Sequence, residues 1–158
     1  MVQDIQIDKA EKNDVADIAR IAYQVAKMHD EAVPEYFKSV PEDGQLQNIK
    51  EMIKDDRIVI FKAMVDGVIC GFLFLEMSHR ISSGLTFSKL GAILNVGVDE
   101  NYRNQGIGTT LLNFTERYVR ELGGEALDLS VFAFNQKAIE FYKRLGYKII
   151  DVSMRKVL

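Results

Sequence analysis

The sequence predicts one α/β domain with a mixed, mostly antiparallel sheet and helices covering the sheet faces. With 158 residues, 47% of them apolar and 27% charged, the chain has the length and composition of one globular domain. Two β-rich segments flank Asp66-Gly67, a pair that favours a type I′ turn between antiparallel strands. A helical pattern separates two later strands, and such crossovers normally join parallel neighbours. We therefore expect one domain over residues 1–158.

The predicted elements follow one another as β-α-α-β-β-β-α-β-α-β. Apolar residues three or four apart predict the helices, and β-rich or alternating runs predict the strands. Glycine and proline mark the connections. The expected strands are 3–8, 58–65, 68–77, 90–98, 126–132 and 147–157, and the expected helices are 44–54, 107–122, 135–145 and one that begins after a cap at Asn13 or Asp14.

The composition of the chain argues against several classes of protein. The 20 Lys and Arg against 23 Asp and Glu give a net charge of −3, which argues against a nucleic-acid partner. The longest apolar run, 68–75, is far shorter than the roughly 20 residues of a membrane-spanning helix. Cys70 is the single cysteine, and its apolar surroundings predict an inert thiol. His29 and His79 have no partners at a metal spacing, so we expect no metal, no membrane partner and a cytoplasmic location.

The segment 98–109 leads from a strand through a polar loop into a helix. The first turn of a helix leaves about four N–H groups unpaired and carries partial positive charge. Gly106 and Gly108 lack Cβ atoms, which allows close approach of a ligand, and Arg103 adds a cation suited to phosphate oxygens. The pattern predicts an anion site for a diphosphate. The alternative is that the glycines only shape a turn and Arg103 is solvated.

A second constellation lies downstream, where Asn135, Ala138 and Tyr142 share one helical face. Asn135 suits a helix N-cap and Gly146 suits the position after the helix. Ala138 is small enough for a ligand to lie along this face. The alternative interpretation makes Asn135 only a cap and Tyr142 only a core aromatic.

These two segments carry a family resemblance. Residues 103–108 are similar to the Arg/Gln-x-x-Gly-x-Gly/Ala signature of the GCN5-related N-acetyltransferases (GNAT), and residues 135–147 resemble that family's Asn-x-x-Ala-x-x-x-Tyr-x-x-x-Gly-Phe/Tyr signature. The resemblance implies the GNAT fold and acetyl-CoA as co-substrate. It also implies that loop amides hold the diphosphate, that strand backbone and Asn135 hold the pantetheine arm, and that Tyr142 lies near the thioester sulfur. The implied cofactor-binding residues are Val96, Gly97, Val98, Arg103, Asn104, Gln105, Gly106, Ile107, Gly108, Thr109, Asn135 and Tyr142.

The implied reaction is direct acetyl transfer to a primary amine in a ternary complex. A tyrosine with a pKa near 10 is protonated at neutral pH, so Tyr142 can donate a proton to the departing thiolate. Some family members carry a carboxylate base on the strand before the loop, where this chain has Asn95. We expect Glu76 to act as the base through water, the alternative being an ordinary solvated strand end.

The resemblance implies an acceptor region built from the first two helices, their connection and the later loops. Acidic residues outnumber Lys38 over 29–43, a surface that attracts a cationic amine or is merely solvated. Tyr36, Phe37 and Asn95 are the expected acceptor-binding residues; the alternative is that Tyr36 and Phe37 only anchor the loop to the core. The sequence leaves open a protein N-terminus, a lysine, a polyamine, an amino acid or an aminoglycoside as acceptor. Three other interpretations of the function are a non-catalytic acyl-CoA sensor, an enzyme that transfers another acyl group such as succinyl, and an unrelated nucleotide-binding protein. The resemblance also implies a homodimer.

Overall fold

A single five-stranded sheet organises the protein, whose structure is a computed structural model that describes residues 4–79 and 87–158. Its strands are β1 (Gln6–Lys9), β2 (Ile58–Val65), β3 (Val68–His79), β4 (Lys89–Val98) and β5 (Ala126–Leu129). They stand in chain order across the sheet, antiparallel except for the parallel pair β4 and β5. The predicted mixed, mostly antiparallel sheet is confirmed.

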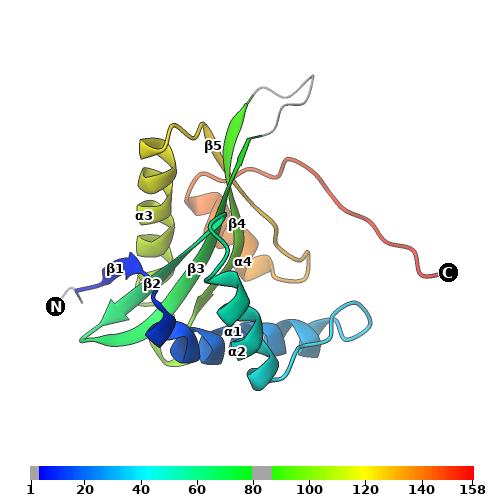
Figure 1. The fold of residues 1–158 in the computed structure, drawn as a ribbon. Coiled ribbons are helices and arrows are strands. Elements are labelled where there is room, and N and C mark those ends of the chain that lie inside the picture. The colour runs from blue at the N-terminus through cyan, green and yellow to red at the C-terminus, as the bar shows by residue number, and fades with distance from the viewer. Residues whose placement is uncertain (1–3, 80–86) are drawn as a thin grey trace.

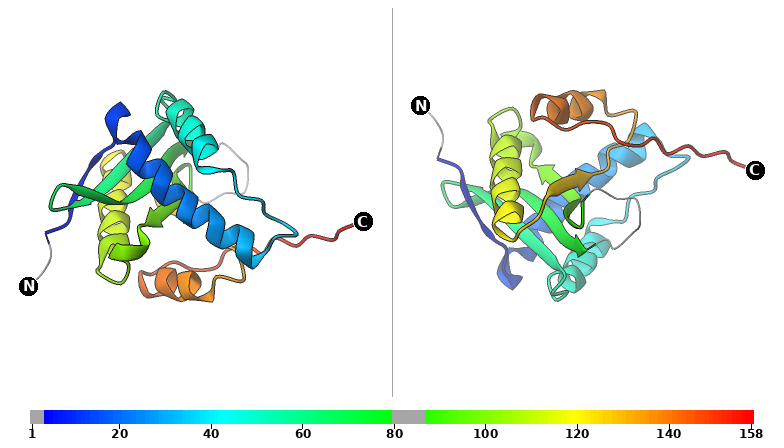
Figure 2. Two further views of the ribbon diagram at one scale, coloured as in Figure 1. Left: turned by 90° about the horizontal axis from the view of Figure 1, so that it is seen from below. Right: turned by 90° about the horizontal axis from the view of Figure 1, so that it is seen from above.

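Helices cover both faces of this sheet (Figures 1 and 2). The helices α1 (Val15–Ala32) and α2 (Glu42–Met52) pack on one face. On the other face lie α3 (Ile107–Glu121), which crosses from β4 to β5, and α4 (Gln136–Arg144). Short 3-10 turns at Lys12–Asp14 and Glu100–Tyr102 precede α1 and follow β4. In the described ranges, 4–79 and 87–158, no helix is long and apolar enough to span a membrane.

The hairpin of β2 and β3 forms the centre of the fold. Asp66 and Gly67 both have positive φ, 50° and 77°, as the predicted type I′ turn requires. Side chains of β3 alternate between two cores: Leu73 and Leu75 pack toward α3, while Phe72 and Phe74 pack toward α1 and α2. All four are buried, and burying such a side chain contributes about 1.5–3 kcal/mol. This two-sided burial explains the uninterrupted apolar run in the sequence.

A bulge in β4 opens the sheet. Phe74 of β3 lies opposite Asn95 and Leu75 lies opposite Ile93, so Leu94 is an extra, exposed residue without a partner. Beyond the bulge the parallel pairing with β5 stops, because β5 registers only with 90–93 of β4. A bulge bends its strand and ends local pairing. The two strands therefore diverge toward the loop that precedes α3.

Several predicted boundaries need correction. The predicted strand 126–132 ends at Leu129, since β4 has by then moved away and offers no partner. The predicted final strand 147–157 is wrong: these residues form no regular element and make no sheet pairing with the described chain. The predicted first strand shifts to 6–9, and its residue Gln3 lies outside the described residues. Most of the predicted polar connection 78–88 also lies outside them, while Ser78 and His79 extend β3.

The first helix begins close to the prediction, at Val15. Asp14 occupies the cap position without making a side-chain cap. Its carboxylate instead accepts a hydrogen bond from the Glu11 N–H and pairs with Lys62 of β2, each at 2.7 Å. Asp14 thus ties the start of α1 to the sheet.

Candidate active site

The loop between β4 and α3 presents an open helix start. Gly106 takes the N-cap position with φ of 85° and Asn104 has φ of 62°, so two left-handed residues turn the chain into the helix. No side chain in the described part of the protein caps α3. The hydrogen bonds of residues 4–79 and 87–158 give the N–H groups of 106–109 no acceptor. Four backbone donors at a positive helix end form an arrangement suited to a diphosphate.

The two glycines of the loop have different roles. A Cβ on Gly106 would meet nothing within 4 Å, so that backbone is open to a ligand. A Cβ on Gly108 would lie 3.3 Å from Cζ of Phe141, so Gly108 serves the packing of α4 against α3. The expectation that both glycines leave room for a ligand therefore needs correction at Gly108.

Other predicted loop residues are fixed by local contacts. Arg103 Nε donates to the Val98 carbonyl and Gln105 Nε2 donates to the Asn101 carbonyl, both at 3.3 Å. Ile107 is buried in the core, which leaves only its N–H for a ligand. Val96 and Val98 likewise pack their side chains against the α3 core, so their contribution to a site is limited to backbone groups.

The loop is anchored by α1 in a way that the sequence did not indicate. Asp99 is 2% exposed and accepts hydrogen bonds from the Arg20 guanidinium and, at 2.9 Å, from the Asn101 N–H. Burial opposes ionisation of Asp99, but these hydrogen bonds and the Arg20 charge outweigh it and lower its pKa. One turn further along α1, Gln24 accepts from the Glu100 N–H at 3.1 Å. The start of the loop is thereby held against α1.

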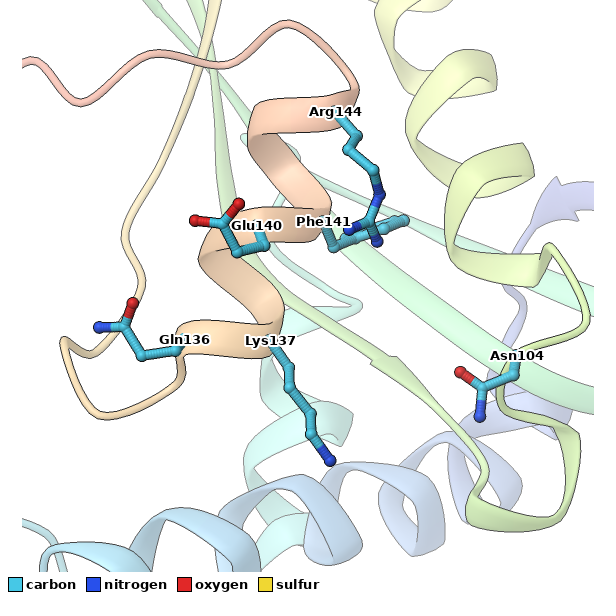
Figure 3. A pocket seen from close by; sticks show the side chains of 6 residues that line it. All are labelled: Asn104, Gln136, Lys137, Glu140, Phe141 and Arg144. Atoms are coloured by element: carbon cyan, nitrogen blue, oxygen red, sulfur yellow. The ribbon is translucent and has the colours of Figure 1, made fainter.

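A groove separates this loop from α4. It encloses about 500 Å³ and is lined by Asn104, Gln136, Lys137, Glu140, Phe141 and Arg144. In Figure 3, Lys137, Phe141 and Arg144 project from the side of α4 nearer Asn104, while Gln136 and Glu140 point away. Lys137 and Arg144 are seven positions apart, a spacing that places both on one helical face. This spacing is visible in the sequence, but it indicates a site only once the loop is known to face α4.

Tyr142 lies on α4 and Asn135 caps the start of this helix, as predicted. Asn135 Oδ1 accepts from the Ala138 N–H at 3.1 Å, which confirms Asn135 as the helix cap. Burial raises the pKa of Tyr142, whose ring packs beside Phe141 and Tyr147 at centroid distances of 5.3 and 5.7 Å. Its hydroxyl makes no hydrogen bond with the described residues, among which no fully buried polar side-chain atom lacks a partner. Because its pKa is raised, the phenol carries its proton at neutral pH.

Helix α1 passes directly over Gly97 of β4. A Cβ there would lie 2.7 Å from Phe72 and 2.8 Å from Val25, so glycine is required for this close crossing. The glycine itself is not bulged, since the bulge lies at Leu94. Asn95 alternates to the same face as Gly97, at the place where β4 and β5 diverge.

An aromatic cluster lies one helical turn beyond Val25. Its members are His29, Phe37, Phe132 and Phe134, with the His29 ring centroid 5.4, 5.1 and 5.7 Å from those of the three phenylalanines. Burial lowers the pKa of His29, which favours a neutral imidazole. Phe37 was a predicted acceptor residue and belongs to this cluster, whereas Tyr36 is exposed beside Arg155 at 5.7 Å. Sequence reasoning did not single out His29 as a site residue, because the cluster joins three separate segments: α1, the connection between α1 and α2, and the segment after β5.

The predicted base Glu76 lies on β3, opposite Ile58 and Ala92. It shares the α1 and α2 face of the sheet with Phe74, which in turn faces Asn95. Two of the acidic residues expected to attract an amine are already engaged: Asp30 accepts from Ser39 at 2.7 Å and Glu31 pairs with Lys27 at 3.7 Å. The described residues contain no group of three or more His, Cys, Asp or Glu able to hold a metal ion.

The match to known proteins agrees with this geometry. The model of the acetyltransferase (GNAT) family matches residues 25–147, most of the chain and both signature segments. The chain belongs to the GNAT family. This acetyltransferase is 31% identical over 118 residues to an N-alpha-acetyltransferase of Sulfurisphaera tokodaii, covering 72% of this chain and 71% of that protein. The family and its named relatives show that the GNAT protein described here is an N-acetyltransferase.

Solved structures confirm the GNAT fold of this N-acetyltransferase. A mutant of the BH1408 protein of Bacillus halodurans superposes with a TM-score of 0.89 at 21% identity, covering 97% of this chain and 99% of that one. The aminoglycoside N-acetyltransferase AAC(6')-Iy, solved in complex with CoA, gives a TM-score of 0.78 at 18% identity, covering 99% and 95%. Acetyl-CoA is the acetyl donor implied by the family, and structural relatives bind CoA.

Proposed function

We propose that this N-acetyltransferase moves the acetyl group of acetyl-CoA directly to a primary amine within a ternary complex. The observation that carries the proposal is the unsealed start of α3 beside the divergence of β4 and β5. A diphosphate bound at the start of α3 directs the thioester arm toward the gap between β4 and β5. The gap between these strands can hold both the acyl group and the incoming amine.

The cofactor site follows from the free polar groups around this opening. The N–H groups of 106–109 hold the diphosphate, with Arg103, Asn104 and Gln105 at its rim. Lys137 and Arg144 across the groove add two cations for the remaining phosphate charge. Backbone groups of Val96, Gly97 and Val98 and the Nδ2 of Asn135, which capping leaves free, hold the pantetheine arm.

The chemistry needs a neutral amine, a stabilised oxyanion and a protonated leaving group. The amine nitrogen bonds to the carbonyl carbon, and a backbone N–H of the Val96–Val98 segment stabilises the oxyanion. The C–S bond then breaks, the thiolate takes the proton of Tyr142, and the new amide nitrogen loses its extra proton to solvent or base. Tyr142 regains a proton from water. Because the amine itself attacks the thioester carbon, no acetyl-enzyme forms.

Two groups are candidates for the base that neutralises the incoming ammonium. Glu76 lies on the sheet face that bears Asn95 and acts through water. His29 lies one turn beyond the crossing of α1 over Gly97, and burial in the aromatic cluster lowers its pKa and keeps its imidazole neutral. The pH dependence of kcat/KM in Glu76→Gln and His29→Asn variants distinguishes them, because only loss of the true base removes the acidic limb.

The acceptor is an amine that carries an apolar substituent, with the amine near Asn95 and the substituent against Phe37 and the rest of the aromatic cluster. Relatives named as N-alpha-acetyltransferase and as aminoglycoside N(6')-acetyltransferase type 1 represent two acceptor classes. A thiol-release assay with acetyl-CoA and an amine panel tests the proposal. The panel contains peptides with apolar or polar N-terminal residues, a polyamine and an aminoglycoside.

Release of CoA with peptides that begin in an apolar residue, ahead of the polar amines, supports this function. CoA binding without release on any amine would favour the alternative of a non-catalytic acyl-CoA sensor. The same assay with succinyl-CoA measures the acyl preference. A labelled acetyl group that stayed on the protein in the absence of amine would overturn direct transfer.

A further inference from the structure

The loop before α3 contains a residue in an uncommon backbone conformation. Asn104 has φ of 62°, and Gly106, two positions later, has φ of 85°. A residue with a Cβ keeps such a left-handed conformation where surrounding contacts hold it there. The direction of the N–H groups of 106–109 depends on this turn. The contacts that hold the turn therefore also determine how those donors are presented.

A continuous series of hydrogen bonds runs from α1 to this turn. The Arg20 guanidinium donates to Oδ2 of Asp99. The other carboxylate oxygen of Asp99 accepts from the Asn101 N–H at 2.9 Å and from Nδ2 of the same residue at 3.2 Å. The Asn101 carbonyl accepts from Nε2 of Gln105 at 3.3 Å, and Gln105 stands between the two left-handed residues. We call Arg20, Asp99, Asn101 and Gln105 the loop network.

The loop network begins on rigid elements and ends on an exposed loop. The side chain of Asp99 is 3% exposed, and its backbone N–H donates to the Cys70 carbonyl of β3 at 2.9 Å. Arg20 belongs to the long helix α1. Asn101 and Gln105, in contrast, lie in the exposed part of the loop. A hydrogen bond to an ionised group that is withdrawn from water is stronger than one between neutral groups at the surface. The buried end of the network can therefore hold the exposed end in place.

We propose that Arg20, Asn101 and Gln105 are positioning residues, which raise the affinity for acetyl-CoA by holding the loop in its diphosphate-binding conformation. This inference rests on the proposed function, because it takes the N–H groups of 106–109 as the diphosphate site. A loop that must become ordered on binding lowers affinity, and a loop held beforehand avoids this cost. The side-chain groups of the network are engaged within the protein, so they act on the ligand through the backbone of the loop.

Calorimetry with CoA and steady-state kinetics on the full chain test the buried end of the loop network. We expect Arg20→Gln to raise the Kd for CoA about tenfold, because the charged donor to Asp99 is lost. The KM for acetyl-CoA rises with it, while kcat at saturation stays within about twofold, since the network supports the bound ground state and transition state alike. Arg20→Lys keeps a charged donor and recovers part of the affinity. Arg57→Gln, the matched control, removes another arginine–aspartate pair, between α2 and β2, and leaves the Kd unchanged.

Gln105→Met tests the exposed end. It keeps the length of the side chain and removes the donor to the Asn101 carbonyl, so we expect the Kd for CoA to rise about threefold. Gln47→Met is its control, because it removes a similar exposed donor, to Glu51 within α2. In the double variant of Arg20→Gln and Gln105→Met, the Kd should rise by less than the product of the two single factors, because both changes act through the same loop.

The outcomes separate this inference from the proposed function. Denaturant unfolding shows that a variant is folded, and Gln105→Met, at an exposed position, carries the test if Arg20→Gln does not fold. Unchanged CoA affinity in the folded variants, single factors that multiply fully, or a lower kcat at constant KM in Arg20→Gln would each overturn the loop network. Wild-type protein that did not bind CoA would instead refute the diphosphate site itself.

Discussion

The guanidinium of Arg20 in α1 donates a hydrogen bond to the buried carboxylate of Asp99, 79 positions later, where β4 enters the loop before α3. This contact joins the helix on one face of the sheet to the loop that starts the helix on the other. It fixes the point from which the open N–H groups of α3 are presented. The start of this loop is thereby held to α1 by contacts within the protein.

Asp99→Asn tests this anchor. The change leaves Arg20 without its charged partner and weakens a charge-assisted network, so we expect a loss of about 2–4 kcal/mol in the free energy of unfolding. Because the folded pKa of Asp99 is lowered, its stabilisation is present above its ordinary pKa and is lost as pH falls through the folded value. Denaturant unfolding at neutral and acidic pH measures both effects. Asp55→Asn is the control, since Asp55 pairs with the exposed Arg57 and a smaller loss is expected.

The conformation of Gly106 provides a second test. Gly106→Ala and Gly67→Ala both place a Cβ at positive φ, 85° and 77°, with open space around it. Each should lower stability by about 1–2 kcal/mol. CoA affinity, measured by calorimetry, should fall in Gly106→Ala only. Equal CoA affinity in the two variants would show that the N–H groups of 106–109 do not bind the cofactor.

Tyr142→Phe tests the proton donor. Loss of the hydroxyl should lower kcat by about a hundredfold or more while KM for acetyl-CoA changes little. Burial raises the pKa of Tyr142, so the wild-type donor stays protonated to a higher pH than an ordinary tyrosine does. Tyr147→Phe removes a hydroxyl from the neighbouring ring and should keep kcat. An unchanged kcat in Tyr142→Phe across pH would reject this role.

The cations of α4 provide a fourth test. Lys137→Glu and Arg144→Glu should each weaken CoA binding about tenfold at low salt, and less at high salt because of screening. Lys143→Glu makes the same charge change on the same helix, but Lys143 pairs with Glu140 at 3.2 Å and does not line the groove. A similar loss of affinity in all three variants would indicate only a long-range effect of net charge.

His29 gives a pH-dependent prediction. Burial lowers its folded pKa, so the stabilisation is fully present above the unfolded value of about 6.5 and is lost as pH falls below it. His29→Gln removes this proton uptake. The decline in unfolding free energy between about pH 7 and 5 should therefore be shallower in His29→Gln than in wild type. Parallel declines in the two proteins would contradict a neutral, buried imidazole.

The turn, the strand and the loop that depend on local sequence patterns were predicted correctly from the sequence. Asp66-Gly67 specifies its turn through backbone conformation alone, and β2 was predicted residue for residue. The loop before α3 was recognised because a strand, two glycines and an amphipathic helix occur in immediate succession. Long-range contacts were not predicted: Arg20 and Asp99, or His29 and Phe132, become neighbours only through the packing of α1. The predicted strand 147–157 has the required alternation, but pattern alone does not supply a partner in the same chain.

Helix α1 links the proposed cofactor surface to the proposed acceptor surface. Successive turns of this one rigid element hold the loop through Arg20 and Gln24, cross β4 at Val25, and place His29 among the phenylalanines. Any rotation or sliding of the helix moves both binding surfaces at once. We therefore expect a ligand that moves α1 at the proposed cofactor surface to change affinity at the proposed acceptor surface, and by thermodynamic reciprocity the change is the same in both directions.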